Sequence, residues 1–534
     1  MANRINFTER QEAGGWAKFL PAISGFYTTH LGKDLSDETF VPVERLPKGF
    51  EFGLQGLNFF DPDYSYFNYK YGLFSAGHAE RKLDRCDDRE PMIHRRQRDK
   101  TILVGDSGGF QVAKGVIKLD WATVKGPEGD KLREEILRYL EHTSDWSMTL
   151  DVPAFAATEP FSAKTGLTKF EDTLDVSIHN LHYFIKNRVI GATKFLNVLS
   201  GSDSDTSKKW YEGVKAFSDK HKVEHDLGYD PARTFEGYAF AGVNMRNMQC
   251  TLERLLNLRD EGLLEGKDWI HFLGVGRLDW ACYLTSIERQ LKKHINPNVN
   301  ISFDAASPFV AAGGYALSYT YNHHTTNRLT YSMDKGLDDK RLKGSKMAMP
   351  FGGPIMERIT AGDICVMGPD DENKHGKIGK TSWDTTSYAI IMAHNVHNHL
   401  EAVQEVNRLA DMEYARMKPV VKKITPLGEC SLFDHDAIDE AEWERFDYRN
   451  WYMYLNKNTK LSEYIPNSIL LFNDFAEKLF DPETKDPYKM LKDYTLFLKD
   501  ISFGRDADNN MNLETMDPPE MYPDYDKDAA SENE

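Results

Sequence analysis

The chain has 534 residues, of which 40% are hydrophobic and 12% are aromatic, and its formal net charge is −17. This composition excludes a disordered or fibrous protein, and the charge excludes a surface that is basic throughout. No apolar run reaches the length of about 18 residues that a membrane span needs, and residues 1–33 lack the apolar centre of a signal peptide. We therefore expect a cytoplasmic protein without a membrane partner.

The five cysteines are scattered along the chain and include no CxxC pair. This spacing argues against a disulfide framework and against a four-cysteine zinc module. We predict reduced thiols, no metal and no other cofactor.

Short apolar runs bounded by Gly, Pro or Asp alternate with segments whose apolar residues have helical spacing. This alternation predicts an α/β protein built as a (β/α)8 TIM barrel rather than an open doubly wound sheet. The eight predicted strands are residues 69–75, 101–105, 146–150, 194–199, 237–243, 269–275, 301–303 and 363–367.

The same pattern predicts the domain organisation. Residues 1–60 form an N-terminal lead segment and residues 61–418 the barrel. A long insertion at about 307–361 separates the seventh strand from the eighth. Residues 419–504 are predicted to form an α-helical appendix, and residues 505–534 an acidic, disordered tail.

Two local clusters of positive charge stand out against the acidic average. Residues 81–100 and the tyrosine-rich insertion both carry several Arg and Lys side chains. In each case two interpretations are open, a solvated face of internal salt bridges or a surface that binds nucleic-acid phosphates. The candidate phosphate-binding residues are Arg95, Arg96, Arg98, Arg341, Lys343 and Lys346.

Carboxylates end three of the predicted strands. Asp106 begins the string DSGGFQ, Asp151 closes SMTLD, and Asp304 closes ISFD. A single Asp in this position is often a helix cap or a turn residue. Three at the mouth of one barrel suit chemistry at an anomeric carbon, where one carboxylate attacks and another moves a proton. A serine protease is excluded because the helical pattern opposes its all-β fold.

Glycine-rich strand ends accompany these carboxylates. The strings FAGVN at 240–244 and LGVGR at 273–277 lack bulky side chains, and this leaves room for a planar base to hydrogen-bond with the backbone. Few tryptophans lie near the strand ends, which makes the polysaccharide groove of a retaining glycoside hydrolase the weaker alternative.

Ordered motifs over residues 101–400 resemble the blocks of the tRNA-guanine transglycosylases. These motifs are DSGGFQ at 106–111, the strand that ends in Asp151, VLSGS at 198–202, GYAFAGV at 237–243, FLGVGR at 272–277, FDAASP at 303–308 and HN at 394–395.

The resemblance implies roles for individual residues. Asp304 would be the nucleophile that attacks the sugar C1′, and Asp106 the acid/base that serves the leaving and entering bases. Phe110 and Leu273 would sandwich the heterocycle. The remaining predicted substrate-binding residues are Asp151, Ser107, Gln111, Ser200, Gly201, Gly242 and Val243.

This sequence departs from the tRNA enzymes in several places. Ser200 replaces the usual glutamine, the arginine-bearing loop after the nucleophile is missing, and the CxCxxC zinc motif is absent. Of the usual zinc ligands only His394 has a counterpart, and a helix face is the preferred interpretation of His394, His397 and His399. The remaining pattern is more similar to the DNA 7-deazaguanine transglycosylases of bacteria and phages (the DpdA group).

The resulting hypothesis is an enzyme that exchanges guanine in DNA for 7-cyano-7-deazaguanine or a derivative. Its partners would be double-stranded DNA and the free 7-deazaguanine base, in the cytoplasm of a bacterium or a phage-infected host. The alternatives are a tRNA-guanine transglycosylase with a divergent periphery and a non-catalytic paralogue that binds nucleic acid. The sequence leaves the oligomeric state open.

Overall fold

The computed structural model describes residues 5–33, 41–315, 317–322, 330–372, 378–424 and 461–503. The predicted acidic tail, residues 425–460 and part of the tyrosine-rich insertion lie outside these ranges. No helix within them has the length and apolarity needed to cross a membrane.

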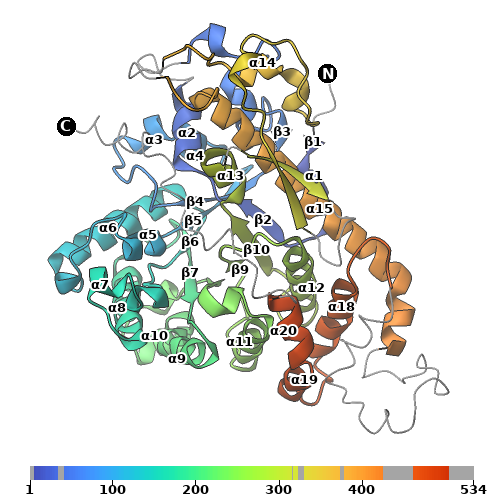
Figure 1. Cartoon of the computed structure of the whole chain (residues 1–534). Helices are drawn as coiled ribbons and strands as arrows, with labels where there is room; N and C mark the ends of the chain where they lie inside the picture. The colour runs from blue at the N-terminus through green and yellow to red at the C-terminus, as the bar shows by residue number, and fades with distance from the viewer. Residues whose placement is uncertain are drawn as a thin grey trace.

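Eight parallel strands form the central sheet, in the order β2-β10-β9-β8-β7-β6-β5-β4 (Figure 1). Between the outer strands, Ala22 bridges to Leu73 and the Ile23 N–H donates to the Leu73 carbonyl at 2.8 Å, so the sheet is nearly closed into a barrel. The strands are β2 (Lys18–Pro21), β4 (Tyr71–Ser75), β5 (Ile102–Asp106), β6 (Trp146–Met148), β7 (Lys194–Leu199), β8 (Gly237–Phe240), β9 (Trp269–Phe272) and β10 (Asn300–Ala305). The predicted (β/α)8 barrel is confirmed.

Helices follow the strands and cover the outside of the barrel. They owe their positions to amphipathic patterns; on α6, for example, Ile136, Leu137 and Leu140 are buried while Glu128 and Asp130 occupy the first turn. The helices after β2 to β9 are α2 (Gly25–Gly32), α3 (Cys86–Arg89), α4 (Pro91–His94), α5 (Gly109–Lys114), α6 (Pro127–Thr143), α7 (Ser162–Thr165), α8 (Phe170–Asn187), α9 (Ser204–Val214), α10 (Lys220–His225), α11 (Met248–Asp260) and α12 (Leu278–His294).

The eighth barrel strand is not where the sequence pattern predicts it. Residues 363–367 were expected to form a strand, but Ala361–Ile364 is the short helix α14, started by a capping box between Thr360 and Asp363. The missing strand is β2, inside the predicted lead segment 1–60, where Lys18 interrupts the apolar run. Residues 307–361 therefore follow the last barrel strand and do not separate two strands.

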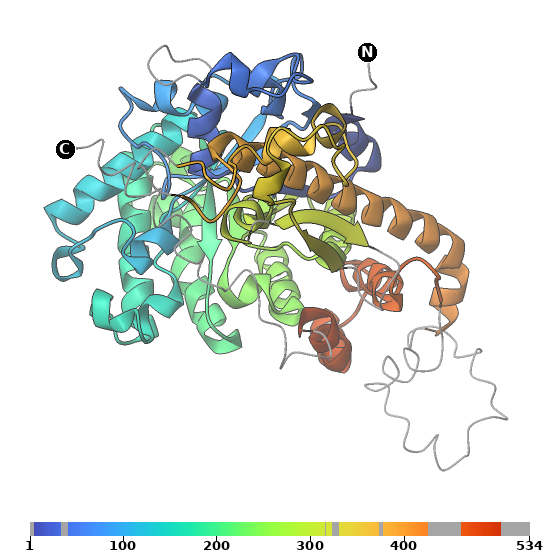
Figure 2. The ribbon, with the colours of Figure 1, turned by 45° about the horizontal axis from the view of Figure 1, so that its top comes forward.

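The chain after β10 builds the rest of the wall. It forms α13 (Ser307–Tyr315), the antiparallel hairpin β11 (Leu317–Asn322) and β12 (Thr330–Lys335), and then the long helix α15 (Thr385–Ile424). Helix α15 contacts β2, α2 and α12, and so it takes the place of the eighth barrel helix (Figure 2).

Two smaller parts complete the fold. At the N-terminus, α1 (Phe7–Gly14) contacts α15, and β1 (Ile5–Asn6) pairs with β3 (Phe67–Asn68). At the other end, the described part of the predicted appendix consists of α18 (Asn467–Leu479), α19 (Pro487–Asp493) and α20 (Thr495–Phe503), which pack against α11, α12 and α15. The appendix is thus continuous with the barrel core, since Leu470, Phe472 and Leu498 are fully buried.

Candidate active site

The three strand-terminal carboxylates lie at one end of the barrel. Asp106 is the last residue of β5, Asp304 is the penultimate residue of β10, and Asp151 follows β6 by three residues. Because all eight strands are parallel, their carboxyl ends form one mouth. The predicted convergence of these side chains is confirmed.

Asp106 is half-buried and lies between hydrogen-bond donors and a second acid. Burial raises the pKa of its carboxyl group, and the negative charge of Asp304 raises it further. Hydrogen bonds from the Ser75 hydroxyl, at 2.5 Å from Oδ2, and from the Gly108 N–H act in the opposite direction. The net effect favours a carboxyl group that keeps its proton at higher pH than an exposed aspartate, as a general acid requires.

Asp151 lies against the turn that follows β5. Burial, together with the charge of Asp106, raises its pKa to about 7. A Cβ atom on Gly109 would lie 2.9 Å from Oδ1 of Asp151 and 2.4 Å from its carbonyl oxygen, so glycine at 109 is what allows these two turns to approach.

Asp304 is held through one carboxylate oxygen. Its Oδ1 accepts hydrogen bonds from the Gly274 N–H at 2.8 Å and from Nε2 of His271 at 3.1 Å. Nδ1 of His271 lies 2.8 Å from Oγ of Ser302, which accepts in turn from the Trp269 indole N–H at 2.8 Å. Each group in this chain therefore donates a hydrogen bond to the next: Trp269 to Ser302, Ser302 to His271, and His271 to Asp304.

The other residues of DSGGFQ have different environments. Ser107 is buried and its hydroxyl donates to the Thr149 carbonyl at 3.2 Å. Nε2 of Gln111 lies 2.9 Å from Nε2 of His78, while the buried Oε1 has no hydrogen-bond partner among the described residues. Phe110 is 44% exposed, with the Lys114 ammonium 4.4 Å from its ring centroid and Phe155 in an edge contact at 5.4 Å.

Two glycines from neighbouring loops touch each other at the mouth. A Cβ on Gly242, which has φ +59°, would lie 2.2 Å from the Gly201 carbonyl oxygen. The same carbonyl accepts the Val243 N–H at 2.8 Å, and the Val243 carbonyl accepts from Asn247 at 2.9 Å. Both backbone groups of Val243 thus make hydrogen bonds within the protein. Ser200 is buried beside these loops, and Leu273 is half-buried.

The six candidate phosphate-binding residues fall into two groups. Arg96 is wrong as a surface contact, because its side chain is 0% exposed and pairs with Asp145 at 2.9 Å. Arg95 pairs with Asp88, and Arg98 donates to the His142 carbonyl. The remaining three, Arg341, Lys343 and Lys346, are exposed on the segment that follows β10.

Two further features lie apart from the three carboxylates. His394, His397 and His399 are buried in α15, where burial lowers the pKa of His394 and of His399 to about 3, and His399 stacks on Phe19 at 4.1 Å. A cavity of about 360 Å³, lined in part by Arg259, His294 and Phe480, lies where α11 and α12 end, away from the carboxylates.

Sequence reasoning missed two residues of the candidate site, His271 and Ser75. Their signals were weak: a histidine inside the apolar run WIHF and a serine at the end of YGLFS. Both directly contact a carboxylate that the sequence did identify.

Comparison with protein-family models and with curated proteins finds no match. The fold and site define the chain as a (β/α)8-barrel protein with three interacting carboxylates at its mouth.

Proposed function

We propose that this protein is a transglycosylase that exchanges guanine in DNA for a 7-deazaguanine through a covalent intermediate on Asp304. The observation that carries the proposal is the electrostatic coupling of the three carboxylates, in which the charge of Asp304 acts on Asp106 and that of Asp106 acts on Asp151. The resemblance of DSGGFQ and its companion motifs to the guanine transglycosylases supports the choice of reaction.

In the first half-reaction Asp304 attacks and Asp106 donates a proton. The hydrogen bonds to Oδ1 orient the Asp304 carboxylate, and Oδ2 forms the bond to C1′ of the flipped nucleotide. The bond from C1′ to the base nitrogen breaks, and its electron pair leaves with guanine. Asp106, whose pKa is raised, supplies the proton that neutralises the leaving base.

The second half-reaction reverses these steps with the incoming 7-deazaguanine. Asp106, now ionised, removes a proton from the ring nitrogen that becomes the nucleophile. That nitrogen attacks C1′ and releases the Asp304 carboxylate. Asp151 would accept hydrogen bonds from the edge of the base, and the exposed ring of Phe110 would stack on one of its faces.

DNA is preferred to tRNA as the substrate because the arginine-bearing loop and the zinc motif of the tRNA enzymes are missing from the sequence. Arg341, Lys343 and Lys346 would contact phosphates beside the mouth. Arg341 pairs with Asp339 but is 84% exposed, and such pairs are weak enough for a phosphate to compete with them.

The test measures incorporation of labelled guanine and labelled 7-cyano-7-deazaguanine into duplex DNA and, separately, into tRNA. Asp304→Asn and Asp106→Asn are expected to lower incorporation about 10⁴-fold or more. Wild-type protein denatured during turnover should carry a DNA adduct that Asp304→Asn lacks.

Three results would contradict the proposal. Incorporation into tRNA alone would exclude the DNA substrate. An adduct that persists in Asp304→Asn would place the nucleophile elsewhere. Absence of exchange with both nucleic acids, from protein whose folding is verified, would exclude the reaction. Lys293→Ala, an exposed change on α12, is the matched control and should leave incorporation unchanged.

A further inference from the structure

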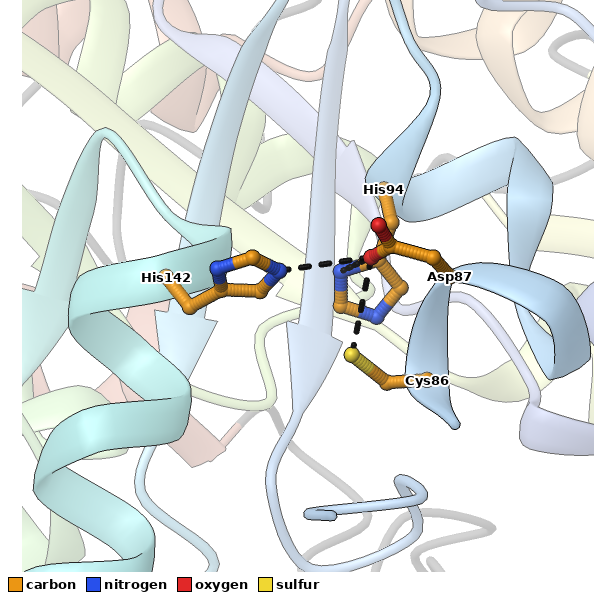
Figure 3. A group of neighbouring side chains, drawn as sticks. All are labelled: Cys86, Asp87, His94 and His142. Carbon is orange, nitrogen blue, oxygen red and sulfur yellow. Dashed lines mark hydrogen bonds and ion pairs between the residues drawn. The ribbon is translucent and has the colours of Figure 1, made fainter. Parts of the chain in front are cut away.

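A second group of chemically active side chains lies on the outside of the barrel. Cys86 and Asp87 come from α3, His94 from the end of α4, and His142 from the last turn of α6 (Figure 3). One ligand atom from each of the four residues lies within 4.8 Å of those of the other three. In Figure 3 the thiol and both imidazole rings point toward the Asp87 carboxylate.

The three distances from the Asp87 carboxylate match those between the ligands of a tetrahedral metal, and all pairs of ligand atoms lie within 4.8 Å. Oδ1 of Asp87 lies 3.6 Å from the Cys86 sulfur, 3.7 Å from Nδ1 of His94 and 3.3 Å from Nε2 of His142. Bonds of about 2.0 to 2.3 Å from zinc to oxygen, nitrogen and sulfur place tetrahedral ligands about 3.3 to 3.7 Å apart. The four atoms therefore need only small movements to bind one ion.

His94 is oriented as metal-bound histidines are. Its Nε2 lies 3.3 Å from the Glu90 carboxylate, which also accepts a hydrogen bond from the Tyr139 hydroxyl. This contact leaves Nδ1 directed at Asp87. That nitrogen is buried and has no hydrogen-bond partner among the described residues. A carboxylate behind a histidine fixes the ring and makes its free nitrogen a stronger ligand.

We propose that Cys86, Asp87, His94 and His142 bind one zinc ion. Zinc accepts sulfur, nitrogen and oxygen ligands in tetrahedral geometry, and this mixed set supplies one thiolate, one carboxylate and two neutral imidazoles. Their two negative charges balance the ion, so the complex is neutral and half-buried at low desolvation cost.

The Cys86 thiol must lose its proton to the solvent when zinc binds. Without the ion, burial and the neighbouring Asp87 raise the pKa of this thiol to about 12. Binding of the cation therefore replaces a proton, as it does at other thiolate sites. Half of the site is open to this exchange, because the side chains of Asp87 and His142 are 56% and 39% exposed.

The site is structural and lies far from the proposed chemistry. His94 precedes the start of β5 and His142 precedes that of β6, so both belong to the amino ends of the strands, opposite the mouth. The ion joins the α3–α4 segment, which lies between β4 and β5, to α6, which lies between β5 and β6. The ligands are eight and 48 residues apart along the chain, which explains why no zinc motif is visible in the sequence.

The experiment uses the full chain, stripped with a chelator and dialysed against zinc chloride. Elemental analysis is expected to find one zinc per chain, and zinc should raise the thermal midpoint by several degrees. Cobalt in place of zinc should give the absorption of a tetrahedral thiolate complex, which Cys86→Ser loses. His142→Ala abolishes stoichiometric uptake, and Glu90→Gln weakens affinity about 10- to 100-fold.

Two variants control for unrelated sites. Cys250→Ser removes another buried thiol, and His225→Gln removes one of two adjacent histidines on α10. Both should retain one zinc per chain. His142→Ala keeps the test valid if Cys86→Ser does not fold, because His142 is partly exposed.

A set of polar contacts around Asp87 without an ion is the competing explanation for the cluster, and it predicts no bound metal. If the wild type takes up no zinc, or if Cys86→Ser and His142→Ala take up as much as the wild type, the assignment is wrong.

Discussion

His271 connects the proposed nucleophile to the interior of the barrel. Nε2–H of His271 donates to Asp304, and its Nδ1 accepts from Ser302, whose oxygen accepts from Trp269. This order of donors fixes the tautomer of the imidazole and the orientation of the Asp304 carboxylate. His271 is thus a positioning residue, and it acts on the reaction through the carboxylate.

Replacing His271 by Ala should lower kcat about 10- to 100-fold, the value of one hydrogen bond to a charged group. KM should change little, because the residue does not reach the base. His271→Gln retains an N–H donor and should recover part of the rate. Steady-state base exchange across a pH range measures both quantities, and an unchanged kcat in His271→Ala would contradict the role.

The sequence predicts a site residue when its position along the chain is conspicuous, and misses it when its role depends on a distant partner. Asp106, Asp151 and Asp304 were identifiable because a carboxylate at the end of an apolar run is conspicuous and the parallel topology brings such ends together. His271 was not, because its role depends on a contact with the neighbouring strand. Arg96 was predicted wrongly, since the sequence does not reveal its buried partner Asp145.

At the scale of elements, one buried carboxylate holds three parts of the barrel together. Glu288 of α12 accepts from Nζ of Lys18 on β2 at 3.0 Å and from the Ile301 N–H at the start of β10 at 2.8 Å. Its side chain is 0% exposed, and that of Lys18 is 9% exposed. This carboxylate therefore ties α12 to the paired strands β2 and β10.

Glu288→Ala should lower the free energy of unfolding by about 3–5 kcal/mol, because it leaves the buried Lys18 ammonium unpaired. Urea denaturation measures the change, and Lys293→Ala on the same helix should stay within about 0.5 kcal/mol of the wild type. The double variant Lys18→Met/Glu288→Leu should recover much of the loss. A loss below about 1 kcal/mol in Glu288→Ala would contradict this role.

The same pair explains which element the sequence pattern missed. Seven of the eight strands predicted from apolar runs are barrel strands. The missing one, β2, begins with Lys18, whose buried ammonium pairs with Glu288. Residues 363–367 were as apolar as a strand, but the capping box at Thr360 starts a helical turn there. Local hydropathy reveals neither the Glu288 partner of Lys18 nor the capping box between Thr360 and Asp363.

At the scale of the whole molecule, buried neutral histidines make stability depend on pH. Burial lowers the pKa of His30 to about 4 and that of His399 to about 3, against about 6.5 in the unfolded chain. Between these values the unfolded chain binds more protons than the folded one, so stability is complete above about pH 6.5 and falls as the pH drops toward 4. Asp151, with its raised pKa, acts in the opposite direction.

We expect each buried histidine to contribute up to about 1.4 kcal/mol per pH unit to this fall. Comparing the urea midpoints of unfolding at pH 7.5 and pH 5.5 measures this pH dependence of stability. His30→Gln keeps a donor for Thr386 but cannot titrate, so it should reduce the loss of stability between pH 7.5 and pH 5.5. His225→Gln changes an exposed residue and should leave that loss unchanged. Equal pH dependence in wild type and His30→Gln would contradict the assignment to this residue.

The closure of the barrel by β2 also sets an order of events during synthesis. Lys18–Pro21 leaves the ribosome about 285 residues before β10, the strand with which it pairs. At about 5–20 residues per second this interval lasts roughly 15–60 seconds. During that time the exposed edge of the segment has no neighbour on one side, so we expect nascent chains of intermediate length to need chaperone protection that the finished barrel does not.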